Sequence, residues 1–406
     1  MNQTPTEGSL VADRYRLESL VGAGGFSRAW RGRDEETGRA VVVKYPNDDS
    51  ANPRRVVEEG LKTELEILRT IRDGGGHPNI MRLVDSVSVD GMPLIVVEYV
   101  EGEDMIDAVK RRNGITDEGD IRTVGLGLCE AMSFLHQNEI IYRDLKPDNV
   151  ILRPDLTPVL IDFNTAKGYD PEERGGTVIR NPVYKPPELN NDPELVGYRQ
   201  GPWSDVYSIG KVLMFCLSGR GVRKDAVDPR DFPGTRSTPG YLAEIIKRAT
   251  QRHKDDRYRN ATVLAYVLKN RDPEPPAFAH VRHVQTGMQY EIFPGDTIGR
   301  AAADGPQPSI AIPDPNNYIS AVQAQFDLDD DDWIVVDRSL NGTWVNRDGD
   351  WQRVLSARGR NRLEATGTDP RQDGVVPAER LALVDGDRIA LVHPDYDVWL
   401  EFETRA

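Results

Sequence analysis

The segment from Arg143 to Asn149, "RDLKPDN", gathers two acids, two bases and an amide within seven residues. Apolar runs that could be strands, "IIY" and "VIL", flank it. A carboxylate can accept a proton, a lysine can neutralise an anion, and carboxylate and amide oxygens can hold a hard cation. The grouping therefore indicates a site that positions and neutralises a charged group, and the elements around it must hold that site in place.

A second segment suited to charge chemistry is the glycine cluster in "LVGAGGFSRAW". Gly22, Gly24 and Gly25 give a backbone that can bend tightly and bring its N–H groups close to a polyanion. β-like runs precede and follow the cluster, whereas a dinucleotide-binding turn opens a helix and a P-loop ends in Gly-Lys-Ser/Thr. We therefore expect a hairpin flap over phosphates, with an ordinary β-turn as the alternative.

A lysine and a glutamate in the same region could form an ion pair. Lys44 ends the apolar run "AVVVK", and Glu64 lies on the helical stripe to which Ile67 and Leu68 belong. We predict that Glu64 faces the sheet and pairs with Lys44. A solvated strand end is the alternative for Lys44, and Glu66, further round the helix, is the competing partner.

The elements that carry these residues form one predicted domain of two lobes, residues 14–271. Residues 14–100 alternate short β-rich runs with one helix. Helical periodicity dominates residues 101–271, where "DVYSIGKVLMFCLSG" is apolar enough to be a central buried helix. Residues 1–13 are expected to be a disordered tail.

A second domain is predicted after a proline-rich boundary. Residues 272–279 are expected to be a linker, because three prolines stiffen the segment "RDPEPPAF". Residues 280–406 contain short alternating apolar runs separated by Gly, Asp and Asn, which is typical of an all-β sandwich. Residues 347–379 are polar and glycine-rich, so we expect a long surface insertion there.

The composition excludes several classes of protein. The 406 residues include 51 Lys and Arg against 66 Asp and Glu, a formal net charge of −15, which argues against general binding to nucleic acid or to an anionic membrane. Cys129 and Cys216 lie in apolar helical patterns and are predicted to be core residues in a reducing compartment. The sequence has no pattern typical of a secretory leader or a membrane span, so we expect a cytoplasmic protein.

Together these residues resemble the ordered motifs of a eukaryotic-like serine/threonine protein kinase. The motifs are "GAGGFSRAW", Lys44, Glu64, "YRDLKPDN", "DFN" (Asp162 to Asn164), "PPE" (Pro186 to Glu188) and "SDVYSIG" (Ser204 to Gly210). The resemblance implies a bilobal α+β fold, with a β-rich N-lobe and a helical C-lobe. "LKP" after Asp144 is similar to the serine/threonine branch, and Arg257 resembles the family's ion-pair partner of Glu188.

The resemblance also implies a role for each site residue. Phosphoryl transfer depends on positioning and charge neutralisation. Asp144 would accept the proton of the substrate hydroxyl, and Lys146 would steady the γ-phosphate. Lys44, oriented by Glu64, would hold the α- and β-phosphates of ATP. The other implied ligands are Gly22, Gly24 and Gly25 for the phosphates, Asn149 and Asp162 for Mg²⁺, Glu98 and Val100 for adenine, and Asp104 for the ribose.

Four positions depart from the family's pattern. Tyr142 stands for the more frequent His before Arg-Asp, and Ser27 stands at the third loop glycine. Asn164 replaces the glycine of Asp-Phe-Gly, and Asn is the non-glycine residue best tolerated at φ > 0. Asn181 stands where a threonine usually contacts the catalytic Asp and Lys. Asn164 and Asn181 leave open the alternative of a catalytically weak or inactive pseudokinase scaffold.

Regulation is predicted in the segment between Asp162 and Glu188. Its aliphatic hydroxyls are Thr165 and Thr177, and Thr177 lies in the middle. Arg143 resembles the arginine that pairs with a phosphorylated activation loop. We therefore expect autophosphorylation at Thr177, with a threonine of no regulatory role as the alternative.

The C-terminal third resembles a forkhead-associated (FHA) domain, a β-sandwich that binds phosphothreonine peptides. The resemblance rests on "TIGR" (Thr297 to Arg300), Ser320, "SLNGTWVN" (Ser339 to Asn346) and "LVDGDRIAL" (Leu383 to Leu391). It implies that Arg300 and Ser320 grip the phosphate and that Asn341 fixes the peptide backbone. Gln323 stands at the position of a structural His, and Ala321 at a position where a basic residue is frequent.

The whole sequence therefore predicts a kinase with a recruiting module. The kinase would transfer the γ-phosphate of ATP to Ser or Thr of protein substrates, using Mg²⁺. The FHA domain would bind phosphothreonine proteins or the chain's own phosphorylated segments, for which Thr4 and Thr6 in "NQTPTEG" are candidates. A small-molecule kinase is less favoured, because "PPE" followed by "SDVYSIG" resembles the family's peptide-substrate segment and its supporting helix.

Overall fold

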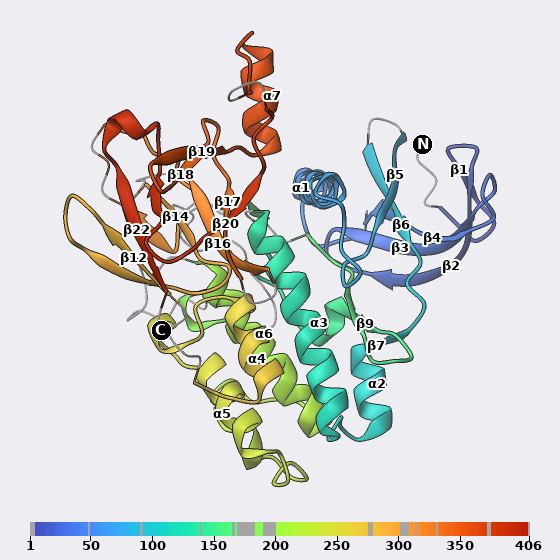
Figure 1. The fold of residues 1–406 in the computed structure, drawn as a ribbon. Coiled ribbons are helices and arrows are strands. Elements are labelled where there is room, and N and C mark those ends of the chain that lie inside the picture. Colours follow the sequence, from blue (N-terminus) through green and yellow to red (C-terminus); the bar gives the residue numbers. More distant parts are fainter. Residues whose placement is uncertain are drawn as a thin grey trace. The chain divides into compact units, whose positions relative to one another are not determined.

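Figure 1 shows the computed structural model of the chain, coloured along the sequence. The structure describes residues 5–47, 49–89, 92–138, 140–164, 167–168, 183–189, 200–274, 279–300, 308–312, 314, 316–329, 332–371 and 375–404. Thr4, Thr165, Thr177 and Asn181 lie outside these residues. The described chain divides into two units, with the boundary between Pro273 and Glu274.

The first unit begins with a six-stranded antiparallel sheet. Its order is β1 (Leu10–Val11), β2 (Tyr15–Ala23), β3 (Ser27–Asp34), β4 (Ala40–Pro46), β6 (Met92–Glu98) and β5 (Leu83–Val89). Apolar side chains on alternate positions, such as Val41 and Val43, form a buried cluster on one face. β1 pairs with β2, which corrects the expectation that the tail is disordered through residue 13.

Helix α1 (Arg54–Asp73) is the single long helix of this part, as the periodicity predicts. Leu61, Leu65 and Leu68 recur at helical spacing and are buried. Glu64 lies on the same stripe and is completely buried, so the helix carries one carboxylate inward among its apolar side chains.

The rest of the first unit is mainly helical. Its helices are α2 (Met105–Arg112), α3 (Glu118–Gln137), α4 (Pro202–Ser218), α5 (Gly240–Ala249) and α6 (Ala261–Asn270). Asp104, Asp117 and Asn260 cap α2, α3 and α6 by accepting backbone N–H groups. Every described residue of α4 from Ser204 to Ser218 is buried, so α4 is the central helix that its apolar sequence predicts.

Short elements carry the charged segment between the helices. They are β7 (Glu103–Asp104), β8 (Ile140–Ile141), the 3₁₀ turn η1 (Pro147–Asn149), β9 (Val150–Leu152), β10 (Pro158–Leu160), β11 (Lys167–Gly168) and η2 (Pro187–Leu189). Two further turns, η3 (Pro229–Asp231) and η4 (Lys254–Asp256), join the later helices. The segment from Arg143 to Asn149 therefore lies between β8 and β9, as its apolar flanks predict.

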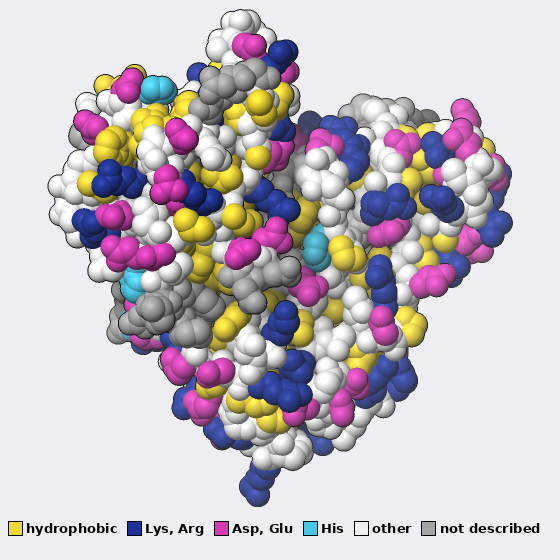
Figure 2. Space-filling model, in the orientation of Figure 1, with side chains coloured by type: hydrophobic (Ala, Val, Ile, Leu, Met, Phe, Trp, Pro, Cys, Tyr) yellow, Lys and Arg dark blue, Asp and Glu magenta, His cyan; other side chains and the backbone are white. Residues whose placement is uncertain are grey.

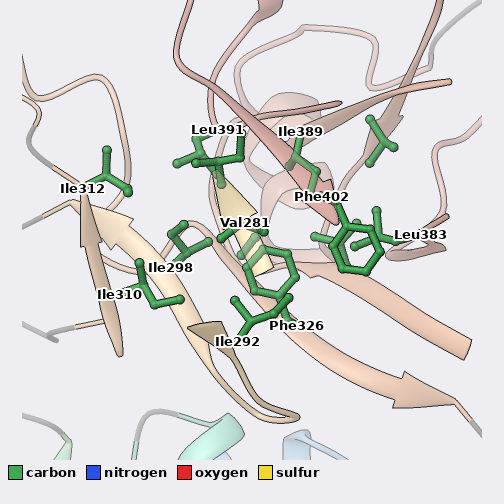
Figure 3. Packing of buried hydrophobic residues seen from close by; sticks show 14 of the residues in the cluster. Val281, Ile292, Ile298, Ile310, Ile312, Phe326, Leu383, Ile389, Leu391 and Phe402 are labelled. Carbon is green, nitrogen blue, oxygen red and sulfur yellow. The ribbon is translucent and has the colours of Figure 1, made fainter. Parts of the chain in front are cut away.

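The second unit is a two-sheet β structure. One sheet has the order β13 (Gln289–Ile292), β12 (Ala279–His283), β22 (Trp399–Thr404), β21 (Arg388–Ala390), β18 (Thr343–Arg347) and β19 (Asp350–Val354). The other has the order β15 (Ile310–Ile312), β14 (Thr297–Arg300), β16 (Ala324–Asp329), β17 (Asp332–Asp337) and β20 (Arg380–Ala382). Figure 3 shows side chains of both sheets, including Val281, Phe326 and Phe402, packed in one core.

The predicted insertion at residues 347–379 is only partly an insertion. Its first part, β19, pairs with β18, and Val354 and Leu355 are buried. Helix α7 (Ala357–Ala365) follows and projects beyond the strands of its unit (Figure 1). The alternating burial of Trp351, Gln352, Arg353 and Val354 could not be separated from a polar loop in the sequence, because the segment has few apolar residues.

The architecture is thus a β-rich lobe, a helical lobe and a β-sandwich, as expected. Among the described helices, none is both long and apolar enough to cross a membrane. On the face in Figure 2, acidic and basic side chains are intermixed. Cys129 and Cys216 are both buried and free.

Candidate functional site

The first part of the site is the contact between Lys44 on β4 and Glu64 on α1. The Nζ atom of Lys44 donates to the Glu64 carboxylate and, at 3.2 Å, to the carbonyl of Ile161. It also lies 3.9 Å from Oδ1 of Asp162. Lys44 is 6% exposed, so it is not a solvated strand end, and Glu66 points to solvent. The buried stripe of α1 thus brings an anion to a cation that β4 would otherwise bury alone.

The surrounding charges keep the Lys44 ammonium protonated. Burial by itself lowers the pKa of Lys44, but the carboxylates of Glu64 and Asp162 outweigh that effect and the pKa lies above its ordinary value. A buried, fixed positive charge is therefore available next to Asp162. Such a charge suits an anionic ligand more than a proton-transfer step.

The second part of the site is the loop between β8 and β9. Lys146 Nζ donates to Oδ2 of Asp144 at 2.6 Å, and Nδ2 of Asn149 donates to the same oxygen at 3.1 Å and to the Asp144 carbonyl at 2.9 Å. Burial raises the pKa of Asp144, and Lys146 and Asn149 oppose that rise. The loop therefore presents the Asp144 carboxylate with its charge partly balanced by Lys146, and this carboxylate can take up a proton.

The helical lobe fixes this loop through Asp205 at the start of α4. The fully buried carboxylate of Asp205 accepts the N–H groups of Tyr142 at 3.0 Å and Arg143 at 2.9 Å, and His136 Nε2 lies 2.8 Å from it. Arg143 has a φ of 69°, a left-handed conformation that needs such support. The motif "SDVYSIG" did not by itself predict this role for Asp205, although an acid in an otherwise apolar helix was a usable signal.

Tyr142 and the segment at Asp162 meet beside this loop. The rings of Tyr142 and Phe163 form an edge-on contact with centroids 5.2 Å apart. The N–H of Asn164 donates to Oδ1 of Asp162 at 3.1 Å. Tyr142 thus packs against the segment that bears Asp162, and Asn164 supports the turn that presents Asp162.

The glycine cluster forms the predicted β-hairpin between β2 and β3. Nδ2 of Asn47 donates to the Gly24 carbonyl at 2.6 Å. The Gly25 carbonyl accepts from Ser50 Oγ at 2.5 Å and from Asn52 Nδ2 at 2.9 Å. These three polar side chains follow β4, and nothing in the sequence reading connected them with the glycines. The hairpin tip is therefore held by a neighbouring loop as well as shaped by its own glycines.

The tip also packs against helix α1. A side chain on Gly60 would come within 2.5 Å of the Phe26 ring, so the ring lies directly on the helix backbone. Gly60 permits that close approach because it has no Cβ. The same helix thus orients Glu64 and supports the hairpin that bears Gly24 and Gly25.

The remaining predicted ligands lie at the junction of the two lobes. β6 ends at Glu98, whose N–H donates to the Arg82 carbonyl at 3.0 Å, and Val100 follows in the connection to β7. Asp104 caps α2, because its Oδ1 accepts the N–H of Ile106 at 2.8 Å. The sequence reading of Asp104 as a ribose ligand did not include this structural role.

Glu188 and Arg257 form the ion pair that the sequence predicts. Their side chains are 2% and 0% exposed, and two parallel hydrogen bonds of 2.9 Å join them. Ser204 Oγ also donates to Glu188 at 2.9 Å. The pair therefore ties η2, which contains Glu188, to the connection between α5 and α6, which contains Arg257.

The second unit presents a cluster around Arg300 and Ser320. Arg300 Nη1 donates to Asn317 Oδ1 at 2.8 Å, and the Arg300 N–H donates to the Ser320 carbonyl at 2.9 Å. Gly299 must be glycine here, because a Cβ would lie 2.2 Å from the Ala321 carbonyl oxygen. The strand β14 and the loop that bears Ser320 are therefore in direct contact.

Gln323 joins this loop to the loop that bears Asn341. Its Oε1 accepts the Ser320 N–H at 3.1 Å, and its Nε2 donates to the Gly342 carbonyl at 2.9 Å and to Thr343 Oγ1 at 3.2 Å. The amide supplies one acceptor and one donor group. It can therefore bridge the two loops at a position where the family has a His.

Comparisons with known proteins agree with this geometry. The protein kinase domain family matches residues 15–275, and the FHA domain family matches residues 297–364. A probable serine/threonine-protein kinase of Clostridium perfringens is 26% identical over 66% of this chain and 40% of its own length. The probable kinase PkwA of Thermomonospora curvata is 29% identical over 74% and 39%, and the kinase PknA of Nostoc is 29% identical over 64% and 48%.

The fold and the site define a bilobal kinase domain joined to an FHA domain. The chain belongs to the protein kinase family. It spans less than half the length of each of the three relatives. Because these relatives are named as serine/threonine kinases, the pseudokinase alternative gains no support from them.

Proposed function

We propose that this chain transfers the γ-phosphate of ATP to Ser or Thr residues of protein substrates. One observation carries the proposal. The buried Lys44–Glu64 pair places an ammonium 3.9 Å from the Asp162 carboxylate, as a site for a nucleotide phosphate and its metal requires. Three elements far apart in the sequence supply these groups, so their meeting is specific to the folded chain.

In this proposal each lobe contributes one half of the chemistry. Lys44 and the hairpin at Gly24 and Gly25 hold the phosphates. Asp144 orients the substrate hydroxyl and accepts its proton as the oxygen bonds to the γ-phosphorus and the β–γ bridging bond breaks. Lys146 lies next to Asp144 and neutralises charge on the transferred group.

The donor atoms near Asp144 suit a magnesium ion. Nδ2 of Asn149 is engaged by Asp144, which leaves its amide oxygen as a potential ligand, and the Asp162 carboxylate would supply a second. The described residues contain no cluster of three or more metal-binding side chains, but Mg²⁺ commonly takes one or two protein oxygens together with substrate phosphates. When bound there, the ion would neutralise phosphate charge.

The FHA domain would add recruitment to this activity. Arg300 and Ser320 would bind the phosphate of a phosphothreonine, and Asn341 would bind the peptide backbone. Thr177, outside the described residues, is the proposed autophosphorylation site, and a phosphorylated tail threonine is a proposed internal ligand.

The test of the kinase proposal is γ-phosphate transfer from labelled ATP. Purified full-length chain would be incubated with Mg²⁺ and a protein substrate, beside Asp144→Asn, and labelled residues would be mapped. We expect labelling of Ser and Thr, including Thr177, that Asp144→Asn abolishes. Absence of labelling in the unchanged chain, with ATP still bound, would instead establish a binding scaffold.

The recruiting role has its own test. Binding of phosphothreonine peptides and their unphosphorylated forms to the full chain would be measured by fluorescence anisotropy. We expect binding that requires the phosphate and is lost in Arg300→Ala. Equal binding of both forms would refute the role without bearing on phosphoryl transfer.

A further inference from the structure

Helix α7 is joined to residues 338–342, the loop between β17 and β18 that bears Asn341 and is proposed to bind the phosphopeptide. This loop is called the recognition loop below. Its N-cap, Ser356, donates from Oγ to the Ser339 carbonyl at 2.8 Å and from its N–H to Asp337 Oδ2 at 2.9 Å. Asp337 also accepts the hydroxyl of Ser339 at 2.8 Å. The first turn of α7 and the recognition loop are therefore one hydrogen-bonded structure.

Close packing reinforces this junction. A side chain on Gly359 would come within 2.6 Å of Leu355 Cδ1 and 3.3 Å of the Ser339 carbonyl oxygen. The backbone of the helix thus lies against the loop with no space between them. A helix held this way keeps a fixed direction relative to Asn341.

Two arginines contact Asn341 itself. Arg362, in the last turn of α7, donates from Nη1 to Asn341 Oδ1 at 2.5 Å. Arg353, on β19, donates from Nη2 to the Asn341 carbonyl at 2.6 Å. Asn341 is exposed, so both guanidinium groups lie where a peptide that reaches Asn341 would pass.

A chain of contacts connects the loop that bears Asn341 with the loop that bears Ser320. Ser320 is bonded to Gln323, and Gln323 is bonded to Gly342, the neighbour of Asn341. The residues from Arg300 to Arg362 thus follow one continuous hydrogen-bonded path.

The charge of helix α7 is opposite to that of the whole chain. The formal net charge is −15, yet α7 contains three arginines and a single glutamate. Arg360 is engaged by Glu379 and by the Pro377 carbonyl. Arg358 is exposed and lies one turn before Arg362, on the same side of the helix.

We propose that α7 is a specificity element of the FHA domain, in which Arg362, with Arg358 beside it, selects phosphothreonine peptides that carry an acidic side chain. This inference rests on the proposed phosphothreonine binding. An arriving carboxylate would exchange with Asn341 as the partner of Arg362, and the released Asn341 amide would bind the peptide backbone. The occupant is thus an acidic phosphopeptide.

The test compares peptides that differ by one charge. Fluorescence anisotropy would measure binding of the full chain to phosphothreonine peptides in which a single Asp is moved along the sequence, with the Asn peptide as reference at each position. We expect one position at which Asp improves the Kd by about three- to tenfold, the range of a partly exposed charge-assisted contact. Arg362→Gln should abolish that preference, and Arg362→Lys should retain part of it.

Arg360→Gln is the matched control on the same helix, because its guanidinium is turned toward Glu379; it should keep the preference. If Arg362→Gln keeps the preference, or weakens all phosphopeptides equally, α7 only supports the loop and the inference is wrong. If no phosphopeptide binds the unchanged chain, or Arg300→Ala binds as well as the unchanged chain, the proposed recruiting function itself fails.

Discussion

The Glu188–Arg257 pair gives a stability prediction with an asymmetry that follows from its hydrogen bonds. Arg257 has other hydrogen-bond partners besides Glu188. It also donates to the carbonyls of Gln251 at 2.7 Å, Arg252 at 2.9 Å and Trp203 at 3.2 Å. Replacing Glu188 by Gln therefore leaves a buried guanidinium that still has three carbonyl acceptors. Replacing Arg257 by Met leaves a buried carboxylate without its cationic partner and removes one hydrogen bond from each of the three carbonyls.

The hydrogen bonds lost in each variant set the expected loss of stability. Removing one partner of a buried ion pair costs about 3–5 kcal/mol, and the remaining acceptors of Arg257 place Glu188→Gln near the lower end. A carbonyl left with no other donor adds about 1–3 kcal/mol, less where water can enter. Arg257→Met should therefore destabilise the first unit by about 5 kcal/mol or more.

Hydrogen exchange in the full chain, followed by mass spectrometry, measures this locally. The slowest amides of α4 report the free energy of unfolding of the first unit. We expect them to exchange about 100-fold faster in Glu188→Gln, since about 1.4 kcal/mol is a factor of ten, and faster still in Arg257→Met. The sheets of the second unit serve as an internal control and should not change.

The exposed pair of Arg54 and Glu58 is the matched comparison, because its side chains are 62% and 31% exposed and Glu58→Gln should leave α4 exchange unchanged. The reasoning is refuted if Arg257→Met costs no more than Glu188→Gln, because the carbonyl contacts would then contribute nothing.

Three further predictions concern the two sites. Asn47→Ala and Ser50→Ala should each raise the KM for ATP by about two- to tenfold with a smaller change in kcat, because each removes one hydrogen bond that holds the hairpin tip; an unchanged KM would mean that the glycines alone set the loop. In the proposed reaction the ionised form of Asp144 accepts the proton, and its pKa is raised, so activity should be lost on the acidic side at a pH above the ordinary Asp range. Lys146 opposes the rise, so Lys146→Ala should move that acidic limb of the pH–rate profile further upward, and Lys146→Arg should not; a limb that stays in place would count against the assignment. Gln323→Ala should weaken phosphopeptide binding at least tenfold in a titration, while Gln323→His should restore most of it; equal affinities would show that the bridge between the loops is dispensable.

Local patterns in the sequence predicted most of the elements. The short apolar run in "AVVVK" predicted β4, and the helical stripe of α1 predicted the inward direction of Glu64 and its meeting with Lys44. The wholly apolar run in α4 predicted a central helix, and the glycine cluster between two β-like runs predicted a hairpin. These predictions succeed because side-chain periodicity reports which face of an element is buried.

The fixed order and separation of motifs added the catalytic loop, the Glu188–Arg257 pair and the FHA residues. This information comes from resemblance, because nothing in the spacing of Asp144 and Asp162 states that their side chains would converge. The short polar strand β19 was missed for the opposite reason: its pattern has too few apolar residues to differ from a surface loop.

Only the tertiary structure decided which polar groups meet across the fold. Asp205 accepts the backbone of Tyr142 and Arg143 from 62 or more positions away, and Asn47, Ser50 and the glycine hairpin meet through carbonyl groups that every residue has. Arg362 reaches Asn341 because Ser356 anchors α7 on the recognition loop. Contacts to backbone atoms and between distant loops leave no periodic mark in a sequence, since any polar side chain of suitable length can make them.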